Sequence, residues 1–303
     1  MYDFETVDVF TDRRFGGNPL AVFTDARGLS SAEMQSLAAE MNLSETTFVL
    51  PPEDSANTAK VRIFNRTAEM PFAGHPTIGT GYVLAKRGYG SDGVLSLEVP
   101  AGLVRVTIET DDDGLPVGGL IAAPQSLTLG EAVPPETVAA CLGLGVDDVV
   151  ISAHAPIIAL VGNPYVIAQV TDEALGRCEP DVVAFRNARE AHPSMDGRFS
   201  LHVYAGQGRH LRARMFAPLA GTWEDPATGS ANAPLGALLL SLSTAEHAEF
   251  EIRQGVEMGR PSLLLVTARR GADGISVTVA GRCVPVLFGR AQVRDQQAWA
   301  CRV

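Results

Sequence analysis

The chain lacks the features of a nucleic-acid-binding or disulfide-stabilised protein. Its 303 residues include only 24 lysines and arginines against 35 acidic residues, giving a formal net charge of −11. Proteins that bind phosphate backbones usually present a basic face, so we expect no nucleic-acid partner. No CxxC pair is present, which argues against a thiol-rich metal site and a disulfide framework. We expect four free thiols in a reducing cytoplasm, at Cys141, Cys178, Cys283 and Cys301.

Long apolar runs and several familiar catalytic motifs are also missing. The longest strongly apolar stretch lies near residues 233–242 and is too short to cross a bilayer, and the acidic N-terminus is unlike a signal peptide. We therefore expect no membrane partner. There is no GxSxG elbow, no Walker-type phosphate loop and no HExxH motif. The five histidines other than His75 show no metal-ligand spacing, and we interpret them as structural.

What is present is a β-rich pattern interrupted by a few helices. Short runs of alternating apolar residues predict many strands, beginning with residues 5–10 and 20–23. The capping-box spacing of Ser30 and Glu33 predicts a helix to about Asn42. Further helices are predicted from His75 to just before Gly88 and over residues 135–142 and 229–242. The acidic turn 111–114 is the best single candidate for a boundary between two halves.

The two halves of the sequence share two motifs in the same order. The segment GGNPLAVF at 16–23 resembles VGNPYVIAQV at 161–170, and EMPFAGH at 69–75 aligns without a gap to EDPATGS at 224–230. Each copy of the second motif follows a strand that ends in phenylalanine, Phe64 or Phe216, and opens a helix. Two motifs that agree in order and context favour an internal duplication over coincidence.

A duplication predicts where a ligand would bind. Two similar halves usually pack about a pseudo-two-fold axis, which would bring the helix starts at 74–75 and 229–230 to one shared cleft. The first N–H groups of a helix are unpaired and carry partial positive charge, so the pair would form a seat for a carboxylate. Gly74 and Gly229 would let the backbone approach that ligand closely. The sequence thus predicts a small anionic substrate.

Four polar residues near these helix starts could carry chemistry, and each also has a structural interpretation. Glu45 could be a proton-transfer acid or a solvated loop acid, and composition alone favours the loop. His75 and Ser230 occupy matching positions, although either could simply serve the start of its helix. Asp225 precedes Pro226 and could initiate a turn. Trp223 could line a pocket or contribute to packing.

Taken together, five segments resemble the phenazine-biosynthesis isomerase family (PhzF-like) within the diaminopimelate-epimerase-like superfamily. They are FGGNPLAVF (15–23), MNLSETTFV (41–49), PFAGHPTIG (71–79), EDPATGSA (224–231) and QGVEMGRPS (254–262). The resemblance implies an α+β fold of two similar lobes, each a β-barrel-like sheet wrapped around a central helix. We assign residues 1–118 and 119–288 to the lobes, with a final strand near 289–303 returning to the first. A cytoplasmic homodimer without cofactor or metal is implied.

The same resemblance implies an activity and a set of residues. The family's defining member isomerises trans-2,3-dihydro-3-hydroxyanthranilate. By that likeness Glu45 would move a proton from C3 to C1, with His75 and Asp225 positioning or polarising the substrate. Substrate-binding residues would be Gly74, Thr228, Gly229, Ser230 and Ala231.

The chain departs from the superfamily's racemases in an informative way. Those two-base enzymes carry a cysteine before the glycine at each helix start, and here Ala73 and Thr228 stand there. Neither side chain can form a thiolate base, so a single-base isomerase of a small, cyclic carboxylic acid is our leading interpretation. The alternatives are an epimerase or racemase that uses Glu45 and Asp225, and a ligand-binding protein on the same scaffold.

Overall fold

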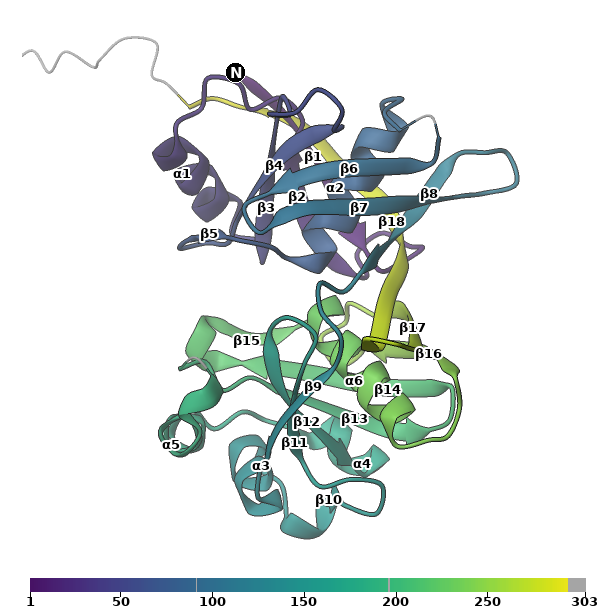
Figure 1. Cartoon of the computed structure of the whole chain (residues 1–303). Helices are drawn as coiled ribbons and strands as arrows, with labels where there is room; N and C mark the ends of the chain where they lie inside the picture. The colour runs from purple at the N-terminus through teal and green to yellow at the C-terminus, as the bar shows by residue number, and fades with distance from the viewer. Residues whose placement is uncertain (91, 196, 294–303) are drawn as a thin grey trace, which may run out of the picture.

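The strands of the protein gather in two groups, each around one long helix. The computed structural model describes residues 1–90, 92–195 and 197–293. In Figure 1 the purple and blue N-terminal strands lie above the green C-terminal ones. Helix α2 (Gly74–Lys86) lies within the first group and α6 (Gly229–Ser241) within the second. The expected α+β class is confirmed, and each group of strands packs around one of these helices.

The first lobe is a closed ring of eight paired strands. The ring runs in the order β1, β2, β3, β4, β6, β7, β8, β18 and returns to β1. A closed ring leaves no unpaired edge and encloses a core, which α2 fills here. The ring strands are β1 (Tyr2–Val9), β2 (Asn18–Phe23), β3 (Glu45–Leu50), β4 (Ala59–Phe64), β6 (Val94–Val99), β7 (Gly102–Thr110), β8 (Pro116–Ala122) and β18 (Gly274–Ala291).

Two elements lie outside this ring. Helix α1 (Ser31–Met41) begins with the predicted capping box, in which the Ser30 side chain accepts from the Glu33 backbone and the Glu33 side chain accepts from Ser30. Met34 and Leu37 of α1 pack with Phe23 and Phe48 of the sheet. The two-residue strand β5 (Glu69–Met70) pairs with the end of β4 and leads into α2.

The second lobe follows the same plan with extra helices. Strands β11, β12, β13, β14, β16, β17 and β18 pair in succession, and β9 covers the free side of β11. The pattern did not predict α4 or α5. The elements are β9 (Thr128–Ala132), α3 (Pro135–Leu142), β10 (Val149–Val150), β11 (Ile157–Leu160), β12 (Pro164–Val170), α4 (Asp172–Arg177), α5 (Val182–Ala191), β13 (Leu201–Gln207), β14 (His210–Ala217), β15 (Thr222–Asp225), β16 (His247–Gln254) and β17 (Ser262–Gly271), with 3₁₀ turns at Val146–Asp148, Pro193–Met195 and Pro218–Ala220.

Strand register supports the duplication residue by residue. Each Gly-Asn-Pro motif starts a strand that pairs in parallel with the next long strand, β2 with β3 and β12 with β13. Thr46 of β3 then pairs with Phe64, and Leu201 of β13 pairs with Phe216. The two phenylalanines that precede the second motif therefore occupy equivalent positions, as the alignment of the halves predicts.

Glycines let the central helices pack closely against the surrounding strands. A Cβ atom on Gly81 would lie 2.8 Å from Cγ1 of Val106, and one on Gly236 would lie 2.6 Å from Cγ1 of Val266. These two glycines occupy equivalent places in α2 and α6. The cost of glycine in a helix is offset here by close packing.

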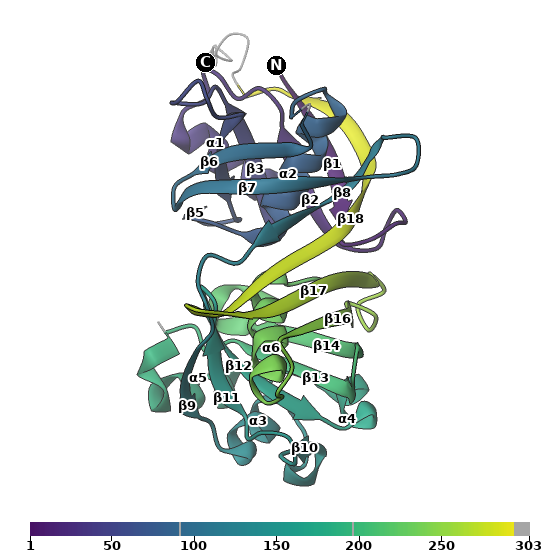
Figure 2. The ribbon, with the colours of Figure 1, turned by 45° about the vertical axis from the view of Figure 1, so that its right-hand side comes forward.

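Strand β18 belongs to both lobes. Its first part pairs with β17, its middle with β8, and residues 283–291 pair with β1 (Figure 2). The chain thus contacts the first lobe from Thr278 through β8 and from Cys283 through β1. Both contacts begin earlier than the expected strand near 289–303, whose part beyond residue 293 lies outside the described residues.

The acidic turn at 111–114 does not separate the lobes. It joins β7 to β8, and these two strands pair with each other in the first ring. The boundary assigned to this turn is therefore wrong, since a polar turn within a hairpin has the same composition as a linker. The chain reaches the second lobe between β8 and β9, while the exact division at residue 118 stays a prediction.

Candidate active site

The starts of α2 and α6 line one cavity of about 380 Å³, which we call the carboxyl cavity. Its walls include all three residues that were predicted to act on the substrate, Glu45, His75 and Asp225. Among the predicted binding residues, Gly74, Thr228, Gly229 and Ser230 line it as well, whereas Ala231 is fully buried and does not line the cavity. Trp223 is 53% exposed and lies outside the lining, so it forms neither a pocket wall nor part of the core.

Glu45 is a buried carboxyl at the first position of β3. It follows the turn after α1, and the parallel pairing of β3 with β2 sets it opposite Leu20. Its side chain is 17% exposed. Burial, together with the charge of Asp225, raises the pKa of Glu45 to about 8, and the charge of Arg66 opposes the shift. A carboxyl with this pKa can both release and accept a proton near neutral pH.

His75 faces Glu45 as a neutral ring. Its Nε2 lies 3.4 Å from Oε2 of Glu45. Burial lowers the pKa of His75 to about 3, while a hydrogen bond from the ring to the Pro19 carbonyl opposes that shift. Nε2 has no hydrogen-bond partner among the described residues, so Nδ1 is the nitrogen that donates to Pro19. The contact is thus not an ion pair, and Nε2 lies near the Glu45 carboxyl without a hydrogen bond to it.

Asp225 ends β15 and accepts hydrogen bonds from both lobes. Asn18 donates from Nδ2 to Oδ1 over 2.9 Å, and the Thr228 hydroxyl donates to Oδ2 over 2.5 Å. Ser44 donates as well. Burial raises the pKa of Asp225 to about 6, with the three donors opposing that shift. Asp225 is therefore the more acidic of the two carboxyls and carries the negative charge at neutral pH.

A buried network of side chains fixes the direction of the Thr228 bond. Gln254 accepts at Oε1 from the Thr228 backbone N–H (3.2 Å) and from Asn232 Nδ2 (2.8 Å). Its Nε2 therefore donates to the Thr228 hydroxyl oxygen, 3.0 Å away, which leaves the Thr228 hydrogen for Asp225. Nε2 of His202 lies 3.1 Å from Asn232 Oδ1 and completes the chain. Such chains polarise each bond in turn and strengthen the last one.

The duplication explains why the cavity holds one copy of each acid. The register places Ser200 where the first lobe has Glu45, and Met70 where the second lobe has Asp225. Ala73 and Thr228 occupy the equivalent N-cap positions of the two helices. Each half therefore contributes a different acid to the cavity.

Several residues of this cavity were not predicted from the sequence. Arg66 lines it and donates from Nη2 to the Gly221 carbonyl over 2.7 Å, which connects the two lobes at the cavity wall. Arg198 also lines it. Tyr165 OH lies 2.8 Å from the Ser230 hydroxyl. These two arginines are the cations among the described lining residues, and they could attract an anionic ligand.

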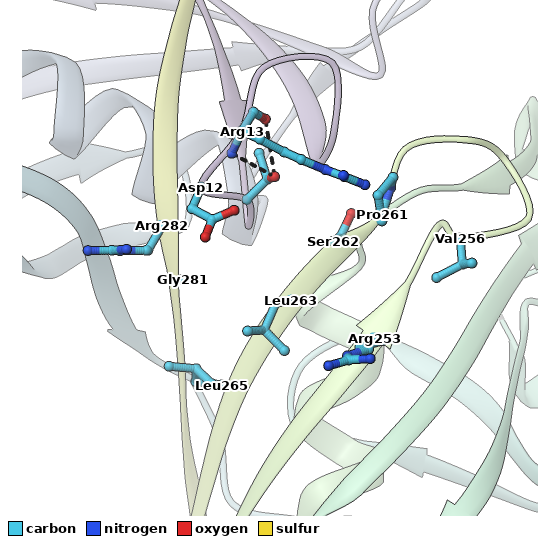
Figure 3. A pocket seen from close by; sticks show the side chains of 11 residues that line it. Asp12, Arg13, Arg253, Val256, Pro261, Ser262, Leu263, Leu265, Gly281 and Arg282 are labelled. Atoms are coloured by element: carbon cyan, nitrogen blue, oxygen red, sulfur yellow. Dashed lines mark hydrogen bonds between the residues drawn. The ribbon is translucent and has the colours of Figure 1, made fainter.

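A separate cavity of about 440 Å³, the outer cavity, lies between the 11–13 loop and strands β17 and β18 (Figure 3). None of the predicted site residues lines it. Figure 3 shows that its arginines do not converge, since Arg13 extends toward Pro261 whereas Arg282 points away from it. We find no arrangement here for acid–base chemistry.

The described part of the chain shows no grouping of three His, Cys, Asp or Glu side chains that could hold a metal ion. In the same residues, no helix is both long and apolar enough to cross a membrane.

Comparison with known proteins places this chain in a family. Residues 7–289 match the family model described as "Phenazine biosynthesis-like protein". The chain belongs to this family. It is 35% identical to a trans-2,3-dihydro-3-hydroxyanthranilate isomerase of Pseudomonas chlororaphis, covering 97% of this chain and 99% of that protein. The isomerase of the same name from Pseudomonas fluorescens is 36% identical, with 97% and 99% covered. The predicted membership in this family and the predicted similarity to isomerases are thus confirmed.

Solved structures agree with this assignment. A phenazine biosynthesis protein of the PhzF family from Bacillus anthracis superposes with a TM-score of 0.86 at 25% identity, covering 96% of this chain and 99% of that one. A protein described as a "Predicted Epimerase" from Pseudomonas aeruginosa gives 0.77 at 30% identity over 96% and 99%. A probable proline racemase from Agrobacterium radiobacter gives 0.59 at 14% identity over 97% and 94%, which shows a shared fold.

Proposed function

We propose that this chain is a cofactor-independent isomerase that moves a proton on a small, cyclic carboxylic acid similar to trans-2,3-dihydro-3-hydroxyanthranilate. One observation carries the proposal: a buried carboxyl, Glu45, lies 3.4 Å from the unpaired Nε2 of a neutral His75 at the meeting point of two helix starts. Two full-length relatives are isomerases of that acid.

The substrate carboxylate would bind at the helix starts. Gly74 and Gly229 are the first residues of α2 and α6, and both line the carboxyl cavity. Backbone N–H groups at two helix starts favour the binding of an anion. No lysine or arginine needs to lie next to that anion. Arg66 and Arg198 would add long-range attraction, which compensates for the acidic balance of the whole chain.

Glu45 would carry the proton. With a pKa of about 8, about a tenth of Glu45 is ionised at pH 7, and this fraction can act as the base. The ionised carboxylate would take the C3 proton, and the resulting acid would return it at C1 as the double bond moves. Neutral His75 could accept one hydrogen bond through Nε2 without adding charge. Asp225 would stay ionised and hold the proton affinity of Glu45 high.

The test is Glu45→Gln, which keeps the shape of the side chain and removes its ability to transfer a proton. With trans-2,3-dihydro-3-hydroxyanthranilate in deuterated buffer, the wild-type chain should form product and the variant should lose at least about 1000-fold in kcat. Glu40→Gln on α1 is the matched control, because it makes the same change at an exposed acid that does not line the cavity. Unchanged turnover in Glu45→Gln would remove Glu45 from its role.

A second candidate is an epimerase that uses Glu45 and Asp225 as its two acids. The presence of both carboxyls in one cavity and the likeness to the protein described as an epimerase support it. A chiral assay of small amino and hydroxy acids separates the two reactions, because an epimerase inverts a centre and an isomerase moves a double bond. Tight binding without turnover in both assays would instead support a ligand-binding role.

We also propose that the chain works as a homodimer in the cytoplasm. Large apolar side chains on the part of β18 that joins the first lobe are exposed, Leu287 by 60% and Phe288 by 69%, and a second copy could cover them. Light scattering of the purified chain should give twice the mass of one chain, and the Phe288→Glu variant should give the mass of a single chain.

A further inference from the structure

A second cavity of about 320 Å³, the apolar cavity, meets the carboxyl cavity at the helix starts. Five residues line both cavities, namely Phe72, Gly74, Asn163, Gly229 and Ser230. A ligand held by the N–H groups at these helix starts would therefore be in contact with both spaces. The carboxyl cavity offers acids and arginines, whereas the apolar cavity offers uncharged side chains.

Buried hydrocarbon forms a large part of the walls of the apolar cavity. Phe10 and Ile78 are fully buried, and Ile121, Ala233 and Val279 are 5% exposed or less. They come from both lobes: Ile78 from α2, Ile121 from β8, Ala233 from α6 and Val279 from β18. None of the described residues that line the cavity carries a charge. Such walls favour an uncharged apolar group over a second acid.

The glycines at the helix starts keep this space open. A Cβ atom on Gly74 would lie 3.5 Å from Cδ1 of Ile121, and one on Gly229 would lie 3.4 Å from Cζ of Phe10. Both distances are ordinary van der Waals contacts, and Ile121 and Phe10 both line the apolar cavity. Protein packing therefore explains the glycine at 81, where a Cβ would come within 2.8 Å of Val106, but it does not require glycine at 74 or 229.

We propose that the apolar cavity is a substrate subsite that takes an uncharged alkyl or aryl group of the acid whose carboxylate binds at the helix starts. The proposal rests on the proposed function for the position of the carboxylate. It adds that the natural substrate carries an apolar group on the side of the carboxylate away from Glu45. A small ring alone would leave this cavity unfilled.

Binding of simple acids tests the subsite without relying on turnover. The probes are benzoate, 3-propylbenzoate and 4-propylbenzoate, measured by calorimetry on the full chain. Burial of three more carbons should make at least one propyl acid bind about tenfold or more tightly than benzoate. Gly229→Ala and Ala123→Leu narrow the cavity and should remove most of that gain, and Ala123→Leu should change benzoate affinity by less than about threefold. Ala123 lies at the partly exposed rim, so its variant should fold even where Gly229→Ala does not.

Gly176→Ala is the matched control, because no atom lies within 4 Å of a Cβ placed there. It should keep both affinities. Equal affinity for all three acids, no binding of any acid, or a gain that persists in both narrowed variants would overturn the subsite. Glu45→Gln should keep the gain for the propyl acid. Loss of turnover in that variant reports on the proposed function alone, so the two can fail separately.

Discussion

Asn18 donates a hydrogen bond of 2.9 Å from Nδ2 to Oδ1 of Asp225, which lies 207 residues later in the chain. The same amide group donates to the Ala227 carbonyl over 3.0 Å. One side chain from the first Gly-Asn-Pro motif thus holds both the acid and the backbone of the second motif of the other half. The two motifs that the duplication revealed are joined at the candidate active site.

Asn18→Ala should weaken both stability and activity. Removing this buried donor leaves Asp225 with one partner fewer, so the pKa of Asp225 should rise further and its charge at neutral pH should fall. We expect a loss of about 1–3 kcal/mol in the free energy of unfolding and about tenfold or more in kcat/KM. Urea unfolding and the isomerase assay measure these.

The control for Asn18 is Asn57→Ala. Asn57 donates to a carboxylate over a similar distance, 2.8 Å to Glu98, but away from the cavity. That variant should keep its activity. If the two variants have equal activity, the Asn18 bond has a structural role only.

The difference in free energy of unfolding between Glu45→Gln and the wild-type chain should shift in favour of the variant as the pH rises. Because burial raises the pKa of Glu45 from 4.5 to about 8, the folded state holds this proton more tightly than the unfolded state does. The wild-type chain therefore loses stability between these two pH values, whereas glutamine does not titrate. At roughly 1.4 kcal/mol per pKa unit, the advantage of the variant should grow by a few kcal/mol, with about 5 as the upper bound. Unfolding curves at pH 5 and pH 8 measure it, and an equal difference at both would contradict the buried acid.

Thr228→Val and Thr228→Ser separate the hydroxyl from the shape of the side chain. Valine removes the donor to Asp225 and the acceptor for Gln254, so the pKa of Asp225 should rise. Serine keeps both bonds. We expect kcat/KM to fall by about tenfold or more in the valine variant and by only a few-fold in the serine variant, since one pKa unit corresponds to about a tenfold change.

Carbon-13 titration of the Asp225 carboxyl measures directly how each Thr228 variant changes the pKa of Asp225. Its midpoint should lie higher in Thr228→Val than in Thr228→Ser. Gln254→Met should shift it in the same direction as valine, because it frees the Thr228 hydroxyl from its fixed orientation. A midpoint that stays the same in all three variants would show that the network does not control Asp225.

Gly81→Ala and Gly236→Ala test the duplicated packing of the central helices. Helix propensity alone would make alanine more stable by about 1 kcal/mol at each site. The added Cβ would approach valine Cγ1 atoms within 2.8 and 2.6 Å, so overpacking of about 1–3 kcal/mol should reverse the sign. Gly176→Ala, with open space around it, should be neutral or stabilising. Two stabilised variants would show that the strands can move away from these helices.

The sequence was most informative where function depends on local motifs. The aligned motifs predicted that the starts of α2 and α6 are equivalent, and the structure places Gly74 and Gly229 on one cavity. Phe64 and Phe216 marked equivalent strand ends. These features depend on short segments whose hydrophobic period and glycine positions are visible in the chain itself.

The remaining features depend on contacts between distant segments. Gln254 was noted as part of a motif, yet its bonds to Thr228 and Asn232 arise only because β16 ends beside the start of α6. Asn18 was visible in a repeated motif, and its bond to Asp225 could have been guessed only from the cross-lobe geometry. Arg66 has no local signal at all. Likewise, β7 and β8 pair across the acidic turn through their register, and composition cannot report register.

The place of β18 in both lobes has a consequence for how the protein is made. The ribosome produces the first lobe before the second, but the first ring closes only when residues 283–291 pair with β1. Until then the edges of β1 and β8 are unpaired, and such edges invite association with other chains. The nascent first lobe thus depends on the last strand to be synthesised, and a truncated product that ends before β18 would leave an open, aggregation-prone sheet rather than a free domain.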